Sequence, residues 1–235
     1  MNPAIPVYVS VVFLMAFSFP LVMIAGLARK HALPTQGNRL FLSIILFYLM
    51  YLTVVAIASF QGLFDEVTLP PRIVQFTTLP LLVFLVGLIF NRRWFKELLK
   101  RIPAHDLIRL HRFRLIGSFF LILLALGLLP PVFALVAGVG DVLTALSSWW
   151  VARLVQSQAT NHRTIALVWN TFGFLDILAT SFMAILFTEW SMEAGTLGVE
   201  VLANFPFCFI PAFAPATILF LHFSIYRKLL VKEFH

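Results

Sequence analysis

Long uninterrupted apolar runs constrain the fold of this sequence more than any other feature. They extend for about 18 or more residues with few or no charges, enough to cross the hydrocarbon core of a bilayer as helices. A soluble domain would instead show helices with one polar face turned to water. The sequence therefore predicts an all-α, polytopic membrane protein, a single bundle of seven transmembrane helices. The predicted spans are about 5–27, 40–62, 72–91, 110–129, 131–153, 164–188 and 205–227, with 92–109 as a cytoplasmic interfacial segment.

The distribution of basic residues gives the expected orientation. With these spans, 16 of the 17 lysines and arginines fall on one side of the membrane and only Arg72 falls on the other. Because cytoplasmic connections carry an excess of Lys and Arg, we expect the N-terminus outside and the C-terminus in the cytoplasm. The basic residues lie between apolar runs, so we expect no nucleic-acid partner despite the net charge of +7.

One boundary, at Pro130-Pro131, has two interpretations. The prolines could form the outer turn between spans four and five, or they could kink a longer span four. In the second case "AGVGD" would form the turn and span five would shrink to about 142–158. We favour the first interpretation because prolines are common at helix starts.

Two carboxylates, Asp141 and Asp176, are the only acidic residues within the predicted spans. Asp141 lies ~15 Å from the outer end of span five, and Asp176 lies ~18 Å into span six from the inner side, at 1.5 Å per residue. Both are thus expected near the bilayer midplane on consecutive antiparallel helices. A carboxylate at that depth costs about 2.5–3.5 kcal/mol, so each should face the bundle interior and find a partner.

Small and polar side chains accompany both carboxylates. Gly138 and Gly140 precede Asp141 in a seam of small residues, which would let another helix approach closely. On span six, Trp169, Gly173 and Thr180 share the face of Asp176. The candidate ligand-binding residues are Asp141, Asp176, Asn170, Thr144, Trp169 and Thr180.

Three hypotheses account for this arrangement. In the first, the carboxylates are protonated or hydrogen-bonded to neighbours such as Thr144 and Thr180, and hold two helices together. In the second, Gly138 and Gly140 break span five, Asp141 caps the inner half-helix, and the pair forms a midplane site for a ligand or ion. In the third, the carboxylates perform acid–base chemistry on a lipid-soluble substrate.

The connection from Asn91 to Arg114 is amphipathic and basic. It is expected to lie partly along the cytoplasmic interface, either as a simple anchor on anionic lipid or as a specific headgroup site. The headgroup site would use Arg109, Arg112 and Arg114.

Span seven carries Pro206, Pro211 and Pro215, which predict a bent helix that lines whatever cavity exists. The sequence predicts no cofactor and no metal site. A haem held by His111 and His222 is the one conceivable alternative, although no attachment motif supports it. Retinal is rejected because no predicted span contains an interior lysine.

The segments "AGVGD", "WNTFGFLDILAT" and "FPFCFIPAFAPATILFLH" resemble small bacterial multipass membrane proteins of unassigned function, mainly over the last four spans. The resemblance implies a bacterial inner-membrane setting and brings no known activity. From the midplane carboxylates we expect a protein that binds or transports a small molecule or ion, with both carboxylates as proton-titratable ligands. A membrane enzyme acting on a lipid or isoprenoid, and a structural or assembly subunit, are the alternatives. The expected partners are the lipid bilayer, a small ligand, and a membrane-protein partner or a second copy of the chain.

Overall fold

The computed structural model describes residues 5–231, and all regular structure in that part of the chain is helical. Lys232, one of the 16 basic residues counted on the predicted cytoplasmic side, lies outside the described residues. The elements are α1 (Val7–His31), α2 (Gly37–Phe60), η1 (Val74–Thr78), α3 (Leu79–Leu82), η2 (Val83–Ile89), α4 (Arg93–Arg101), α5 (Ala104–Leu110), η3 (His111–Gly117), α6 (Ser118–Ala125), α7 (Pro131–Gln156), α8 (His162–Ala194), η4 (Glu200–Ala203) and α9 (Phe209–Leu230).

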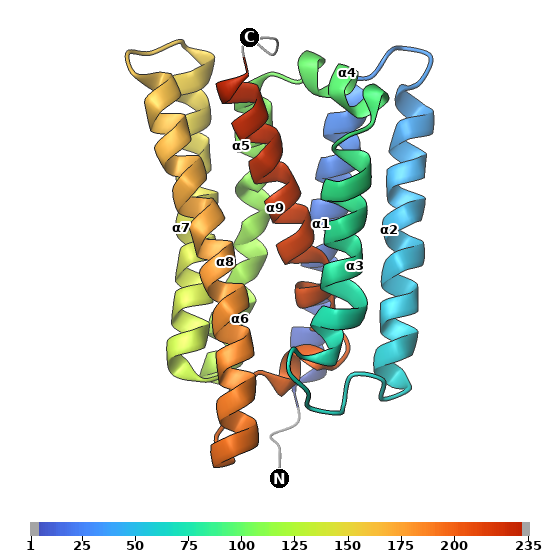
Figure 1. The fold of residues 1–235 in the computed structure, drawn as a ribbon, viewed down its shortest axis with the longest axis vertical. Coiled ribbons are helices and arrows are strands. Elements are labelled where there is room, and N and C mark those ends of the chain that lie inside the picture. The colour runs from blue at the N-terminus through green and yellow to red at the C-terminus, as the bar shows by residue number, and fades with distance from the viewer. Residues whose placement is uncertain (1–4, 232–235) are drawn as a thin grey trace.

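The long helices run side by side, and their connections alternate between the two ends of the bundle (Figure 1). The α1–α2 turn, helix α4, the α7–α8 turn and the end of α9 lie at one end, together with Arg29, Arg92 and Arg153. We call this the basic end. The opposite end holds the α2–η1, α6–α7 and α8–α9 connections with Glu66 and Glu200, and we call it the acidic end.

Five helices are long and apolar enough to cross a membrane, namely α1, α2, α7, α8 and α9. A sixth candidate, the run Val74–Ile89, bends by 82° into α4, which therefore lies across the bundle axis. The predicted span 110–129 is not one regular helix, because the 3₁₀ segment η3 separates α5 from α6. Among the described residues there are thus five membrane-length helices, or six with the bent pair, where the sequence predicts seven spans.

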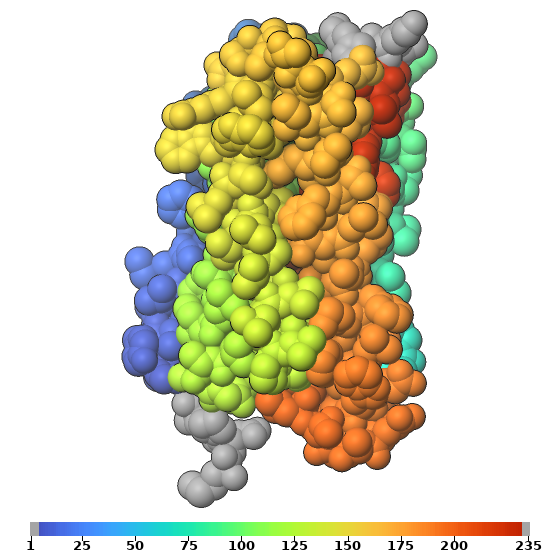
Figure 2. Space-filling model, turned by 90° about the vertical axis from the view of Figure 1, so that its left-hand side faces the viewer, coloured from blue at the N-terminus to red at the C-terminus, as the bar shows by residue number. Residues whose placement is uncertain are grey.

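Large apolar side chains cover the outside of the bundle. Met15, Met50, Leu146 and Phe182 are each at least 60% exposed. Figure 2 shows one such outer face, where α7 and α8 lie side by side. An apolar surface this extensive is unfavourable in water, so it fits a chain surrounded by lipid.

Helix α9 lies inside the bundle and continues through Pro215. A proline has no N–H to offer the carbonyl four residues earlier, here that of Pro211. Thr78 of η1 supplies the missing donor: its Oγ1 donates to the Pro211 oxygen at 2.7 Å. A neighbouring span thus satisfies the backbone group that the proline leaves open, which makes an intramembrane proline tolerable.

Helix α7 resolves the two questions about span five. It begins at Pro131 with Pro130 as its N-cap, so the prolines form the turn before this helix, as favoured. The hypothesis that Gly138 and Gly140 break the helix is wrong, because α7 runs unbroken from Pro131 to Gln156. Helical glycine costs only about 1 kcal/mol relative to alanine, and packing against neighbouring helices offsets this.

Candidate functional site

A single buried arginine, Arg114, joins the two intramembrane carboxylates. Its side chain is fully buried; its Nε donates to Asp141 Oδ1 at 2.6 Å, and its Nη2 donates to Asp176 Oδ2. Its Nη1 donates to the Gly173 carbonyl at 3.1 Å. The guanidinium thus connects η3, α7 and α8. With all three groups ionised, two negative charges face one positive charge, so the cluster has one carboxylate in excess.

The neutral form of His222 completes the surroundings of the guanidinium. The Asn170 Nδ2 donates to the His222 backbone oxygen at 3.2 Å, which directs the amide oxygen of Asn170 toward the ring. That oxygen lies 2.8 Å from His222 Nδ1, so Nδ1 carries the hydrogen and donates. Nε2 then keeps its lone pair and accepts from Arg114 Nη1 at 3.4 Å. Asn170 therefore selects the tautomer that contacts the arginine.

Three glycines make room for this ion cluster. A Cβ at Gly117 would collide with the Asp141 carboxylate, and one at Gly140 would collide with the Asp176 carboxylate. A Cβ at Gly173 would lie 2.8 Å from His222 Cε1, closer than real side chains approach. Each glycine belongs to a different element, η3, α7 or α8. The seam of small residues in the sequence thus allows charged groups, as well as helix backbones, to approach closely.

Two further polar side chains beside His222 have no hydrogen-bond partner among the described residues. His111 is 0% exposed and neither of its ring nitrogens is bonded there; the buried Thr144 Oγ1 is also without a partner in that part of the chain. Each such group costs about 1–3 kcal/mol unless water or a ligand pairs with it. The site therefore has unused hydrogen-bonding capacity next to the charged cluster.

The rings of His111 and His222 pack directly together, with centroids 4.4 Å apart, and the Trp169 ring contacts His111 edge-on at 5.3 Å. This packing leaves no room for a haem between the two histidines. Among residues 5–231, no group of three or more His, Cys, Asp or Glu side chains is arranged to hold a metal ion.

Apolar side chains close the cluster off from both ends of the bundle. Toward the basic end lie the buried Leu99, Ile108 and Ile225. Toward the acidic end lies a larger core that includes Phe13 and Phe207. A void of about 10 Å³ borders Arg114 and Asp141, close to the smallest space that holds one water molecule. The polar site is thus closed off from both ends of the bundle, and within it Asp176 is partly buried.

A sequence model of one protein family, described as a domain of unknown function (DUF8737), matches residues 71–230. The chain belongs to the DUF8737 family. Every residue of the ion cluster and of its histidine surroundings lies within this DUF8737 segment, whereas α1 and α2 precede it. No curated protein and no solved structure matches the chain.

The structure brings together most of the residues proposed from the sequence. Asp141 and Asp176 contact the same arginine, and Asn170 orients His222. Thr144 and Trp169 border the site, and Trp169 Nε1 donates to Ser147 Oγ at 3.0 Å. Thr180, one turn beyond Asp176, is half-buried and makes none of the cluster's hydrogen bonds.

The placement of Arg114 corrects the sequence interpretation. It was expected at the cytoplasmic interface with Arg109 and Arg112, but it is buried inside the bundle. Arg109 instead contacts Gln156 and Asp106 near the surface, and the exposed Arg112 donates to the Arg109 carbonyl. The physical reason is electrostatic: a buried carboxylate (Asp141) and a partly buried one (Asp176) are costly without a positive partner, and Arg114 supplies it.

Sequence reasoning also missed His111 and His222 as members of the site. The sequence suggested these histidines only as conceivable haem ligands, whereas His222 is 0% exposed and contacts Arg114 and Asn170. One signal was present: Arg114 is the basic residue that reaches deepest into a predicted apolar span, opposite two carboxylates that lack a cation. Matching the acidic and basic residues within the predicted spans, before assigning basic residues to the loops, would have identified Arg114 as their partner.

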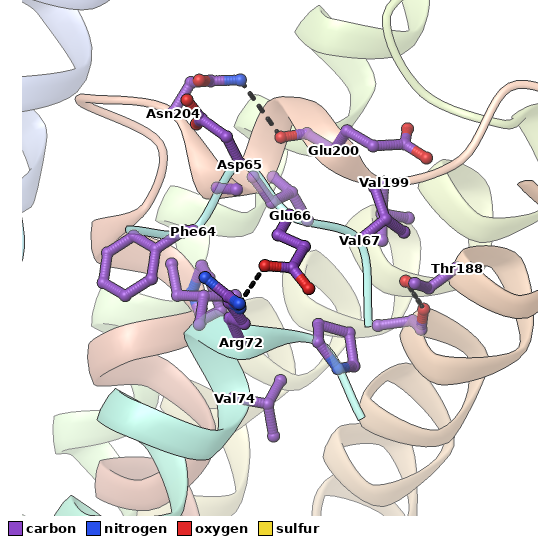
Figure 3. A pocket seen from close by; sticks show the side chains of 16 residues that line it. Phe64, Asp65, Glu66, Val67, Arg72, Val74, Thr188, Val199, Glu200 and Asn204 are labelled. Atoms are coloured by element: carbon purple, nitrogen blue, oxygen red, sulfur yellow. Dashed lines mark hydrogen bonds and ion pairs between the residues drawn. The ribbon is translucent and has the colours of Figure 1, made fainter. Parts of the chain in front are cut away.

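Other polar features lie away from the cluster. A cavity of about 310 Å³ opens at the acidic end, where Glu66 pairs with Arg72 and Asn204 Nδ2 donates to the Glu200 carbonyl (Figure 3). None of its lining residues belongs to the ion cluster.

At the basic end, Lys30 and His31 of α1 contact Asp106 of α5 at 2.8 and 2.9 Å. Burial acts to raise the pKa of Asp106, but the hydrogen bonds from Lys30 and His31 outweigh it and hold that pKa below its usual range. This cluster fastens α1 to the DUF8737 segment.

Proposed function

We propose that this DUF8737 protein is a seven-span bacterial inner-membrane protein that binds or moves a small molecule or ion, coupled to a proton at the Arg114 cluster. The observation that carries the proposal is the stoichiometry of charge: one guanidinium bonds two carboxylates in an apolar interior. Counting Val74–Ile89 and the run from His111 to Ala125 as spans gives seven. The basic end then faces the cytoplasm, following the distribution of Lys and Arg.

The excess carboxylate is the basis for proton coupling. A buried charge without a counter-charge is costly, so an isolated cluster with net charge −1 favours uptake of one proton. A cationic ligand could replace that proton, because either one neutralises the cluster. Competition between a proton and a cation or amine for the same carboxylates is a simple physical route to coupled transport.

The surroundings of the cluster support movement between accessible and closed states. Apolar layers separate it from both ends, so it corresponds to an enclosed state of a carrier. The bundle contains non-α turns both at the cluster and behind α9: η3 is a 3₁₀ segment that carries Arg114 itself, and the π-helical η1 and η2 pack against α9. Such turns often mark places where helices rearrange.

The alternatives have weaker support. An enzyme acting on a lipid or isoprenoid would need its carboxylates in an apolar cavity, but the large apolar cavity of this chain includes neither Asp141 nor Asp176 in its lining. A structural subunit would use the same cluster only to hold helices together. It would then keep one fixed protonation state.

Infrared difference spectroscopy on protein in lipid nanodiscs tests the proposal. Wild-type protein should show a carboxylic-acid carbonyl band that appears as the pH is lowered. Asp141→Asn or Asp176→Asn should remove or shift that band, whereas the control Asp65→Asn, at an exposed acidic-end residue, should leave it unchanged. A band that never titrates, together with lowered thermal stability in both cluster variants, would refute proton coupling and favour a structural role.

Native mass spectrometry of gently purified protein then searches for a retained ligand. An adduct that disappears in Asp141→Asn would identify the chemical class of the ligand. Turnover of an added lipid that both variants lose would favour the enzyme instead. A stable complex with another membrane protein, unaffected by either variant, would favour the assembly subunit.

A further inference from the structure

A second, separate cavity lies on the other side of α9 from the ion cluster. It has a volume of about 320 Å³ and is enclosed by α1, α2, the Val74–Ile89 run, α4, α5 and α9. Its lining is almost entirely apolar and includes Phe47, Phe84, Leu98 and Phe220. A partly open apolar cavity within the bilayer accepts hydrocarbon and excludes a polar ligand.

The position of α4 sets the depth and the direction of this cavity. Because α4 bends by 82° from the preceding helix, it lies across the basic end of the cavity. Its buried residues Phe95, Leu98 and Leu99 face inward, while Lys100 and Arg101 on its other side are exposed. The cavity therefore extends from mid-bundle, at Tyr48, to the membrane surface beneath an amphipathic interfacial helix.

The end of the cavity nearest the surface is strongly basic. The exposed Arg39 directly precedes the lining residue Leu40, and the exposed Arg93 directly precedes the lining residue Trp94. The nearby carboxylates are already engaged: Glu97 pairs with Lys100, and Asp106 is held by Lys30 and His31. The headgroup of a lipid whose acyl chain occupies the cavity would thus lie among exposed arginines.

We infer that this cavity is a specific site for an anionic phospholipid, with one acyl chain inserted beneath α4 and the phosphate between Arg39 and Arg93. Charge complementarity selects the headgroup, since each Lys or Arg near a membrane surface attracts anionic lipid. The apolar lining selects the chain. The site is independent of the ion cluster, because the two share no residue.

This location differs from the headgroup site predicted from the sequence. Arg109 is engaged with Gln156 and Asp106, Arg112 with the Arg109 carbonyl, and Arg114 with the buried carboxylates. The guanidinium groups of that segment are thus held by protein partners. Arg112 of this segment therefore serves as a control position in the test below.

Native mass spectrometry of delipidated protein in a neutral detergent, titrated with phosphatidylglycerol or phosphatidylcholine of identical acyl chains, measures the preference. Wild-type protein should bind phosphatidylglycerol more tightly. Arg39→Gln/Arg93→Gln should lower the preference for phosphatidylglycerol about 30-fold. Each of the two lost charges contributes separately to the attraction of anionic lipid, so their effects multiply. The control Arg112→Gln/Arg163→Gln changes the net charge equally and should retain the preference.

A second pair of variants tests the cavity itself. Ser43→Trp places a large ring at a lining position and should abolish tight binding of either lipid, whereas Leu46→Trp, on the exposed face of the same helix, should not. The inference is overturned by a wild-type protein without headgroup preference, by equal loss in both arginine pairs, or by unchanged binding in Ser43→Trp.

Discussion

Removal of the charge that holds the two carboxylates is the most informative perturbation of this protein. Arg114→Met keeps an unbranched side chain but leaves Asp141 and Asp176 without their shared cation. Removing one partner of a buried ion pair typically costs about 3–5 kcal/mol, because the remaining charge stays buried without compensation. For a chain of this length, 1 kcal/mol shifts the melting temperature by about 2–4 °C, so we expect a decrease of about 6–20 °C.

The triple variant Arg114→Met/Asp141→Asn/Asp176→Asn separates charge from packing. It lacks the same arginine but leaves no uncompensated charge, and buried ion networks can often be replaced by neutral groups without loss of stability. It should therefore recover at least half of the stability that the single variant loses. The single variant should also be less impaired at low pH, because protonation removes the buried negative charges.

Thermal unfolding in nanodiscs, followed by tryptophan fluorescence at several pH values, measures both effects. Arg112→Met, at an exposed arginine two residues away, is the control and should change stability by no more than about 0.5 kcal/mol. If the triple variant is as unstable as the single variant at every pH, the loss arises from missing arginine packing. The electrostatic account of the site would then be wrong.

Three further predictions concern packing and the ends of the bundle. Gly140→Ala drives a methyl group into the α8 carboxylate and should cost about 1–3 kcal/mol, whereas Gly26→Ala meets open space and should be neutral or stabilising in the same melting assay. Thr78→Val removes the donor to the Pro211 carbonyl and should cost about 1 kcal/mol; no change in melting temperature would mean that water replaces the hydroxyl. Asp106 has a lowered pKa in the folded state, so its stabilisation is present above its ordinary pKa of about 4 and is lost as the pH falls through the lower folded value. Asp106→Asn should therefore lower the melting temperature near neutral pH. It should also make the melting temperature fall less steeply as the pH is lowered, and a fall as steep as in the wild-type protein would contradict this assignment.

Local sequence patterns predicted the five membrane-length helices, α1, α2, α7, α8 and α9. Apolar runs located the long helices, because the hydrophobic requirement of a membrane span is a property of about 20 consecutive residues. Pro130-Pro131 correctly placed the start of α7, since proline restricts the backbone locally. The interruption at η3 was missed because a 3₁₀ turn inside an apolar run leaves no clear compositional signal.

The candidate site was predictable in part. The cost of a carboxylate at mid-membrane identified Asp141 and Asp176 from the sequence alone, and the neighbouring glycines indicated a close approach. The sequence could not show that Gly140 makes room for a carboxylate of another helix, or that α7 stays unbroken there. Those outcomes depend on atoms far apart in the chain.

The sequence by itself determined that this chain consists of long apolar helices, that its charges separate toward two ends, and that two carboxylates lie deep within the apolar spans. These properties follow from the free energy of transferring each segment between water and hydrocarbon, which depends on local composition. Only the tertiary structure decided that Arg114 is the partner of both carboxylates and that Asn170 fixes the tautomer of His222. Pairing of buried charges depends on distances between helices, and those distances are set when the helices pack together.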